Sequence, residues 1–198
     1  MIKPFNKKIK KAGFTLIELL VVITIFTIIT GIVLFNQNQF NGSILLTNLA
    51  YDLSLDIRQA QTFGGGGKTS VSFVIATSAP VYGIHLDQGI ANNKNIILFG
   101  DYNNDGLYTN SELIEQSKIT RSNVISLVQY INSSGVTTTP SVIDVTFKRP
   151  EAAAHLFVNS ATPEITDFDK IIITISNTYT NQTRKVVISK LGLIYVEK

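Results

Sequence analysis

The sequence predicts an α+β protein, in which a long N-terminal helix packs on an antiparallel β-sheet domain. Two observations carry this prediction. Residues 14–63 hold apolar side chains at helical spacing without a proline, and after Lys68 the apolar period changes to two. We expect four parts along the 198 residues: a leader, a membrane-crossing and polymerisation helix, an amphipathic helix and a globular β domain, at 1–13, 14–35, 36–63 and 64–198.

The apolar stretch 14–35 is long enough to cross a bilayer. As a helix it would span about 33 Å, and it contains a single charge, Glu18. Five lysines precede it: Lys3, Lys7, Lys8, Lys10 and Lys11. Because positive charge stays on the cytoplasmic side, we expect a single pass through the cytoplasmic (inner) membrane, with the N-terminus inside and the C-terminus outside. Membrane lipid is therefore an expected partner.

Glu18 is the residue that a plain membrane anchor does not explain. An ionisable side chain inside a bilayer costs a few kcal/mol unless it is partnered, and the stretch holds no Lys or Arg. A secretory signal does not fit either, because the apolar run is long and no A-x-A site follows it. A cut between Gly13 and Phe14 would create an amine four residues from Glu18, which could meet the carboxylate of a neighbouring subunit.

The run Gly13-Phe14-Thr15-Leu16-Ile17-Glu18, between a lysine-rich leader and an apolar stretch, resembles the class III signal of type IV pilins and pseudopilins. The resemblance implies that a prepilin peptidase cuts after Gly13 and methylates Phe14. It also implies that Glu18 aligns each subunit against its neighbour in a filament. The implied partners are the prepilin peptidase, other pilins or pseudopilins and an inner-membrane assembly platform. The implied destination is a pilus or pseudopilus, periplasmic or extracellular.

Residues 36–63 keep helical spacing, so one face of this segment should pack on the β domain, and the glycines at 64–67 should end the helix. This helix, a strand that ends at Asp101 and a terminal hairpin at 184–196 are similar to H-type pseudopilins of type II secretion and FimT-like minor pilins. That resemblance favours a minor subunit over a major one.

Short runs rich in β-branched residues, separated by turn residues, predict the strands of the β domain. These runs are 71–75, 81–86, 95–99, 113–119, 124–131, 142–147, 171–175, 185–189 and 193–196.

One loop carries a metal-binding pattern. Residues 101–112 read DYNNDGLYTNSE and satisfy D-x-[DN]-x-[DN]-G-x5-E at every position. The pattern predicts a Ca²⁺ site because it supplies several hard oxygen ligands on one loop. Its candidate ligands are Asp101, Asn103, Asp105, Leu107 through its carbonyl, Thr109 and Glu112. The flanks read as strands rather than EF-hand helices, so a polar turn remains the alternative.

Charge and motifs argue against nucleic-acid binding and against catalysis. The net charge is +3, but removal of the five leader lysines from 17 Lys+Arg leaves 12 against 14 Asp+Glu, a mature charge of −2. Nucleic acid is therefore a disfavoured partner that would need a local basic patch. His85 and His155 stand in strand-like or apolar contexts outside any metal or nucleophile motif, so we expect no enzyme. The chain has no cysteine, which excludes disulfides.

The sequence therefore predicts a non-enzymatic minor pilin or pseudopilin, a subunit of a type IV pilus or a type II secretion pseudopilus. Two alternatives stay open. One is a minor pilin at a filament tip that binds DNA or a surface. The other is a membrane-anchored β domain that does not polymerise and keeps its leader.

Overall fold

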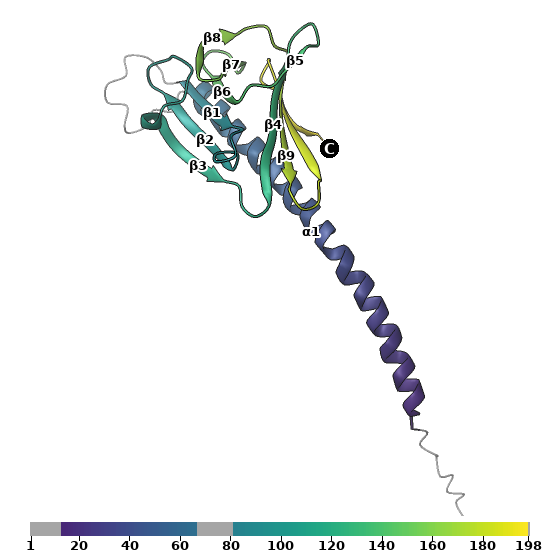
Figure 1. Ribbon diagram of the computed structural model, residues 1–198. Helices are drawn as coiled ribbons and strands as arrows, with labels where there is room; N and C mark the ends of the chain where they lie inside the picture. The colour runs from purple at the N-terminus through teal and green to yellow at the C-terminus, as the bar shows by residue number, and fades with distance from the viewer. Residues whose placement is uncertain (1–12, 67–80, 198) are drawn as a thin grey trace, which may run out of the picture. The chain divides into compact units, whose positions relative to one another are not determined.

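The computed structural model describes residues 13–66 and 81–197, without the side chains of 35–41 and 161. Within these residues one long helix precedes eleven strands (Figure 1). The helix α1 spans Leu16–Gly66, and a 3-10 helix, η1, spans Asn110–Glu112. The strands are β1 Val81–Asp87, β2 Asn95–Asp101, β3 Leu113–Lys118, β4 Asn123–Ile131, β5 Thr137–Thr138, β6 Val142–Phe147, β7 Ala154–Val158, β8 Ala161–Ile165, β9 Lys170–Asn177, β10 Thr183–Ser189 and β11 Ile194–Glu197. The predicted α+β class is confirmed.

The chain divides into two compact units after Asn41, and α1 contributes to both. In the first unit, Leu16–Leu34 is long and apolar enough to cross a membrane, and its side chains are not buried by the rest of the chain. The hydroxyls of Thr24 and Thr27 donate to the helix carbonyls of Leu20 and Ile23, at 2.8 and 2.7 Å. These polar groups are thus satisfied within the helix, as a lipid environment requires.

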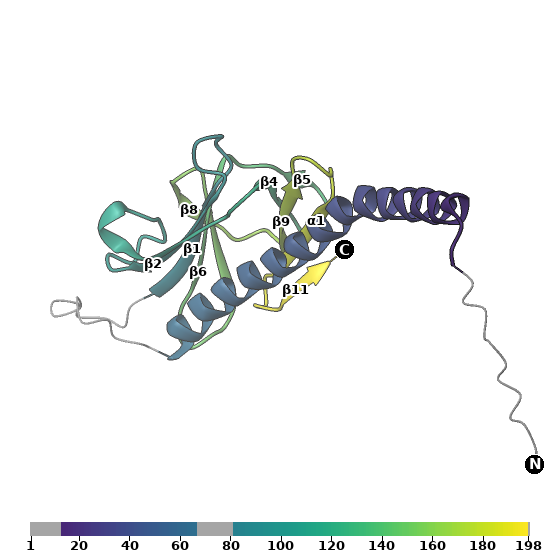
Figure 2. The same cartoon turned by 90° about the horizontal axis from the view of Figure 1, so that it is seen from below.

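The second unit consists of residues 42–198, where α1 packs beside two antiparallel sheets (Figure 2). One sheet, here sheet A, has the strand order β3-β2-β1-β6-β7-β8. The other, sheet B, has the order β11-β10-β9-β4-β5. The buried face of α1 repeats every three to four residues, as an amphipathic helix predicts. Its fully buried side chains are Leu46, Ala50, Leu53, Ile57 and Ala60.

The apolar side chains of α1, sheet A and sheet B form a single core. Polar contacts between α1 and the chain beyond it add to this packing. The Arg58 guanidinium donates to the carbonyl of Ile194 at 2.8 Å. The Gln61 amide donates to the carbonyls of Ala152 and Gly192, at 2.9 and 2.8 Å. Because these bonds satisfy main-chain groups at the start of β11 and before β7, they fix the position of α1 along the sheets.

Eight predicted strands appear, with ends shifted by at most two residues, as β1, β2, β3, β4, β6, β9, β10 and β11. The predicted strand 71–75 lies outside the described residues. The strands β5, β7 and β8 were not predicted. The helix continues through Gly64 and Gly65 and ends at Gly66, within the glycine run 64–67 that was predicted to end it. Gly64 also allows close packing, because a Cβ there would collide with the main chain of Phe147.

Candidate functional site

The predicted cleavage site lies just before α1 begins. Residues 13–15 are not helical, and α1 starts at Leu16. The Phe14 side chain is 88% exposed. A Cβ on Gly13 would meet no described atom within 4 Å. The bond between Gly13 and Phe14 therefore lies outside the helical hydrogen-bond ladder, where a peptidase can bind it in an extended form.

Glu18 has a partner in its own chain, which is Thr15. One Glu18 carboxylate oxygen accepts hydrogen bonds from the backbone N–H and the hydroxyl of Thr15, both at 3.0 Å. The Glu18 N–H donates in return to the Thr15 hydroxyl at 3.3 Å. This reciprocal pair is a capping box at the start of α1. The sequence prediction considered only a cationic partner for Glu18 and therefore missed Thr15. The T-x-x-E spacing, which is typical of a capping box, is the signal that could have identified it.

The loop 101–112 connects β2 to β3 through η1, and the Asp101 side chain is buried at its start. The two Asp101 carboxylate oxygens accept from the N–H groups of Asp105 and Gly106, at 3.2 and 2.8 Å. The side-chain oxygen of Asn103 accepts from the Asp105 N–H at 3.0 Å, and an Asp105 oxygen accepts from the Leu107 N–H at 2.8 Å. Side chains in the first half of the loop therefore accept hydrogen bonds from the loop's own backbone N–H groups.

Glu112 closes the loop from the other end and is also buried. One of its oxygens accepts from the N–H and hydroxyl of Thr109, at 2.9 and 2.7 Å, and the other accepts from the Tyr102 N–H at 3.1 Å. Burial raises the pKa of Asp101 to about 6; amide hydrogen bonds oppose this shift, and the charges of Glu112 and Asp105 add to it. The hydrogen bonds that both carboxylates accept thus stabilise the turn, whereas burial disfavours the charged form of Asp101.

These contacts account for the motif as a turn, the alternative interpretation of its sequence. In the described part of the chain, no three His, Cys, Asp or Glu side chains lie close enough together to hold a metal ion. Asp101, Asn103 and Asp105 come together around the amides, whereas Thr109 and Glu112 bond to one another. Calcium binding at Asp101, Asn103, Asp105, Leu107, Thr109 and Glu112 stays a prediction.

Both histidines lie on strands of sheet A, and each pairs with an acidic side chain on the neighbouring strand. Nδ1 of His85 lies 2.6 Å from a carboxylate oxygen of Asp144, its register partner on β6. Nδ1 of His155 lies 2.8 Å from a carboxylate oxygen of Glu164. Sequence reasoning missed both pairs, because strand order decides which residues become neighbours. His85 also lines a cavity, which is described below.

Comparison with known proteins adds one match. A family model described as the prokaryotic N-terminal methylation motif matches residues 8–34. Searches of curated proteins and of solved structures found no match. The matched region contains Gly13, Phe14 and Glu18 in register with the apolar helix. Residues 8–34 of this chain are therefore an N-terminal methylation motif, the class III signal of type IV pilins.

Proposed function

We propose that this protein is a minor pilin or pseudopilin, which a prepilin peptidase processes after Gly13 and which then joins a filament. The observation that carries the proposal is the methylation motif at residues 8–34, in register with a helix that begins at Leu16. The exposed, non-helical surroundings of Gly13 and Phe14 support cleavage at that bond.

Before processing, the chain crosses the inner membrane once, with its lysine-rich N-terminus in the cytoplasm and residues 42–198 outside. This orientation follows from the positive charge before the span. The exposed apolar side chains of Leu16–Leu34 supply the surface for packing against other subunits. Assembly moves this helix from lipid to protein, so packing and polar pairing drive it rather than the hydrophobic effect.

Glu18 aligns neighbouring subunits in this proposal. In the single chain, the backbone N–H and the hydroxyl that Thr15 offers to the carboxylate are neutral donors, so they leave its negative charge uncompensated. Cleavage creates a cationic amine on Phe14, and the amine of a neighbouring subunit offers Glu18 an opposite charge inside the membrane. The capping box therefore holds Glu18 at the helix start until a neighbour arrives. The resemblance of the helix, of the strand that ends at Asp101 and of the hairpin 184–196 to H-type pseudopilins and FimT-like minor pilins favours a minor subunit.

Mass spectrometry of the chain from cells that contain a prepilin peptidase tests the proposal. We expect a mature protein that begins at methylated Phe14, and a full-length chain for Gly13→Val. Gly31→Val is the matched control, because a Cβ at Gly31 also meets no described atom within 4 Å and the cleavage site is unchanged. An unshortened wild type would overturn processing. That result is what the membrane-anchored alternative predicts, because it keeps its leader. A processed chain that never enters sheared filaments would overturn assembly.

A further inference from the structure

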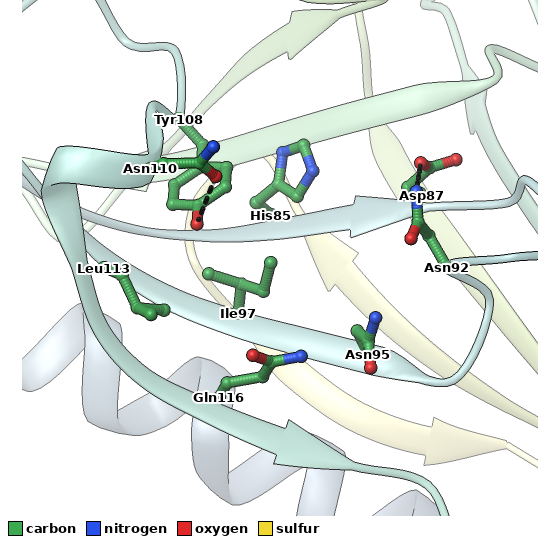
Figure 3. A pocket seen from close by; sticks show the side chains of 9 residues that line it. All are labelled: His85, Asp87, Asn92, Asn95, Ile97, Tyr108, Asn110, Leu113 and Gln116. Atoms are coloured by element: carbon green, nitrogen blue, oxygen red, sulfur yellow. Dashed lines mark hydrogen bonds between the residues drawn. The ribbon is translucent and has the colours of Figure 1, made fainter.

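A cavity of about 470 Å³ lies against strands β1, β2 and β3 of sheet A (Figure 3). It falls within the range of about 300–1,000 Å³ that small-molecule sites occupy. Side chains from these three strands, from η1 and from the loops 88–94 and 102–109 line it. Its polar lining is mainly His85, Asn92, Asn95, Tyr108, Asn110 and Gln116. The proposed filament role does not use this cavity.

The lining is rich in groups that both donate and accept hydrogen bonds. Each of its four amide side chains offers an N–H₂ and a carbonyl oxygen. The one charged side chain in the lining, Asp87, is already engaged: its oxygens accept from the Gly89 N–H at 2.7 Å and from the Asn92 amide at 2.6 Å. No Lys or Arg belongs to the described lining. The cavity therefore suits a neutral polar ligand rather than an anion.

His85 is oriented towards this cavity by a buried carboxylate. Its Nδ1 is engaged with Asp144 at 2.6 Å, and the Asp144 side chain is 1% exposed. The second Asp144 oxygen is buried without a hydrogen-bond partner among the described residues. A buried, incompletely paired carboxylate costs stability. What the pair achieves is a fixed ring orientation, with Nε2 left for a hydrogen bond with a ligand.

Tyr108 gives the cavity a rigid aromatic surface. Its ring lies 4.7 Å from the His85 ring and 5.6 Å from the Phe99 ring, and its hydroxyl lies 3.3 Å from the Asn110 side-chain oxygen. Ile97 and Leu113 add aliphatic surface. The cavity thus combines apolar surface with several polar groups at fixed positions, as small-molecule sites do.

We propose that this cavity binds a neutral sugar residue. A sugar ring has an apolar C–H face that can stack on Tyr108, and its hydroxyls both donate and accept, like the amides around them. A purely apolar ligand would leave the amides unpaired, and an anion would find no cationic partner. A metal ion would find one imidazole nitrogen and a carboxylate that is already bonded. The sugar could be free or the terminal residue of a glycan.

The test titrates the full chain, in a detergent without a sugar head group, with methyl glycosides of glucose, galactose, mannose and N-acetylglucosamine. We expect saturable binding of at least one glycoside with a Kd of about 1 mM. Gln116→Leu and Asn110→Leu should each weaken it about fivefold or more, since each removes ligand hydrogen bonds. Both side chains are exposed, so the fold should survive. Gln129→Leu, in β4 of sheet B, makes the same chemical change away from the cavity and should bind as the wild type does.

Three results would overturn the proposal. They are no saturation by any glycoside at about 20 mM, equal binding by the wild type and both cavity variants, or tighter binding of inorganic phosphate than of every glycoside. Titration with a trisaccharide that ends in the sugar that binds distinguishes a free sugar from the terminal residue of a glycan. Affinity equal to that of the glycoside identifies a free sugar as sufficient, and tighter binding identifies the end of a glycan chain.

Discussion

Gly64 of α1 lies directly against Phe147 of β6. A Cβ on Gly64 would lie 2.8 Å from the carbonyl carbon of Phe147 and closer still to its oxygen. Glycine therefore sets how closely the end of α1 approaches sheet A. Because backbone rather than a flexible side chain forms the contact, the strand itself would have to move to accept a larger residue.

Gly64→Ala should destabilise the β domain by about 1–3 kcal/mol, since overpacking a close contact costs that much. Urea unfolding of the fragment 42–198, which contains all the core residues that the structure describes, measures the effect.

Gly65→Ala is the matched control for this prediction. A Cβ at Gly65 meets no described atom within 4 Å, and alanine is a better helix former than glycine by up to about 1 kcal/mol. Gly65→Ala should therefore stabilise the fragment or leave it unchanged. Equal effects of the two variants would show that helix propensity, rather than contact with Phe147, determines the result.

Glu18→Val should reduce incorporation into filaments while leaving membrane insertion intact or improved. The substitution removes the charge that costs a few kcal/mol in a bilayer, and with it the partner for a neighbouring amine. Shearing of filaments followed by blotting measures incorporation, and membrane fractionation measures insertion.

Thr15→Val separates the two roles of Glu18. It removes the hydroxyl of the capping box, worth about 1 kcal/mol to the helix start, and retains the carboxylate. If subunit alignment depends on a neighbouring amine, Thr15→Val should still enter filaments. Loss of incorporation to the same degree in both variants would assign the function of Glu18 to the cap.

The long helix and most strands could be predicted because their signals are local. The apolar period defines α1, and β-branched runs define strands such as β6 and β9. The hairpin of β7 and β8 was missed because its first strand reads AHLFV, which begins with residues of modest β-propensity. Its signal is Asn159-Ser160, whose φ values of 54° and 51° suit a two-residue hairpin turn.

The N-terminal site could be predicted from sequence, whereas the cavity could not. Gly13, Phe14 and Glu18 lie within six residues, so a linear motif describes them. His85 and Asp144 are 59 residues apart and meet only because β1 pairs with β6. Apolar periodicity does not encode which strands become neighbours.

The half-buried Asp56 of α1 should make stability depend on pH. Burial raises its pKa, the charges of Glu115 and Asp52 raise it further, and a Ser117 hydrogen bond opposes them. A raised pKa contributes stability that is full below the unfolded value and is lost as the pH rises through the folded value. The wild type should therefore gain stability relative to Asp56→Asn as the pH falls from 7 to about 4.

Asp167 provides a control, because its pKa is shifted in the opposite direction to that of Asp56. Hydrogen bonds from Ser133, the shorter at 2.6 Å, lower the pKa of Asp167. Its contribution is present above the unfolded pKa and is lost as the pH falls through the folded value. Asp167→Asn should therefore be most harmful near pH 7. Urea unfolding of the fragment 42–198 at both pH values measures each variant, and the same trend for both would contradict the assignment.

Calcium binding by residues 101–112 should raise the melting temperature of the fragment 42–198 over that in chelator. Linkage sets the gain at ~2.7 kcal/mol for calcium at a hundredfold excess over its Kd. Magnesium should stabilise less, because it prefers rigid octahedral shells and keeps its water. The gain should also shrink below about pH 6, where Asp101 becomes protonated.

Asp105→Asn is the sharpest variant for this test. Asn at this position can still accept the hydrogen bond from the Leu107 N–H, so the turn should persist, while one ligand charge is lost. Asp101→Ala and Glu112→Ala are less informative, because both carboxylates accept amide hydrogen bonds that hold the loop without any metal. Asp87→Asn makes the same change at a turn outside the motif and should keep the full calcium gain. If the wild type melts equally in calcium and in chelator, the carboxylates serve only the turn.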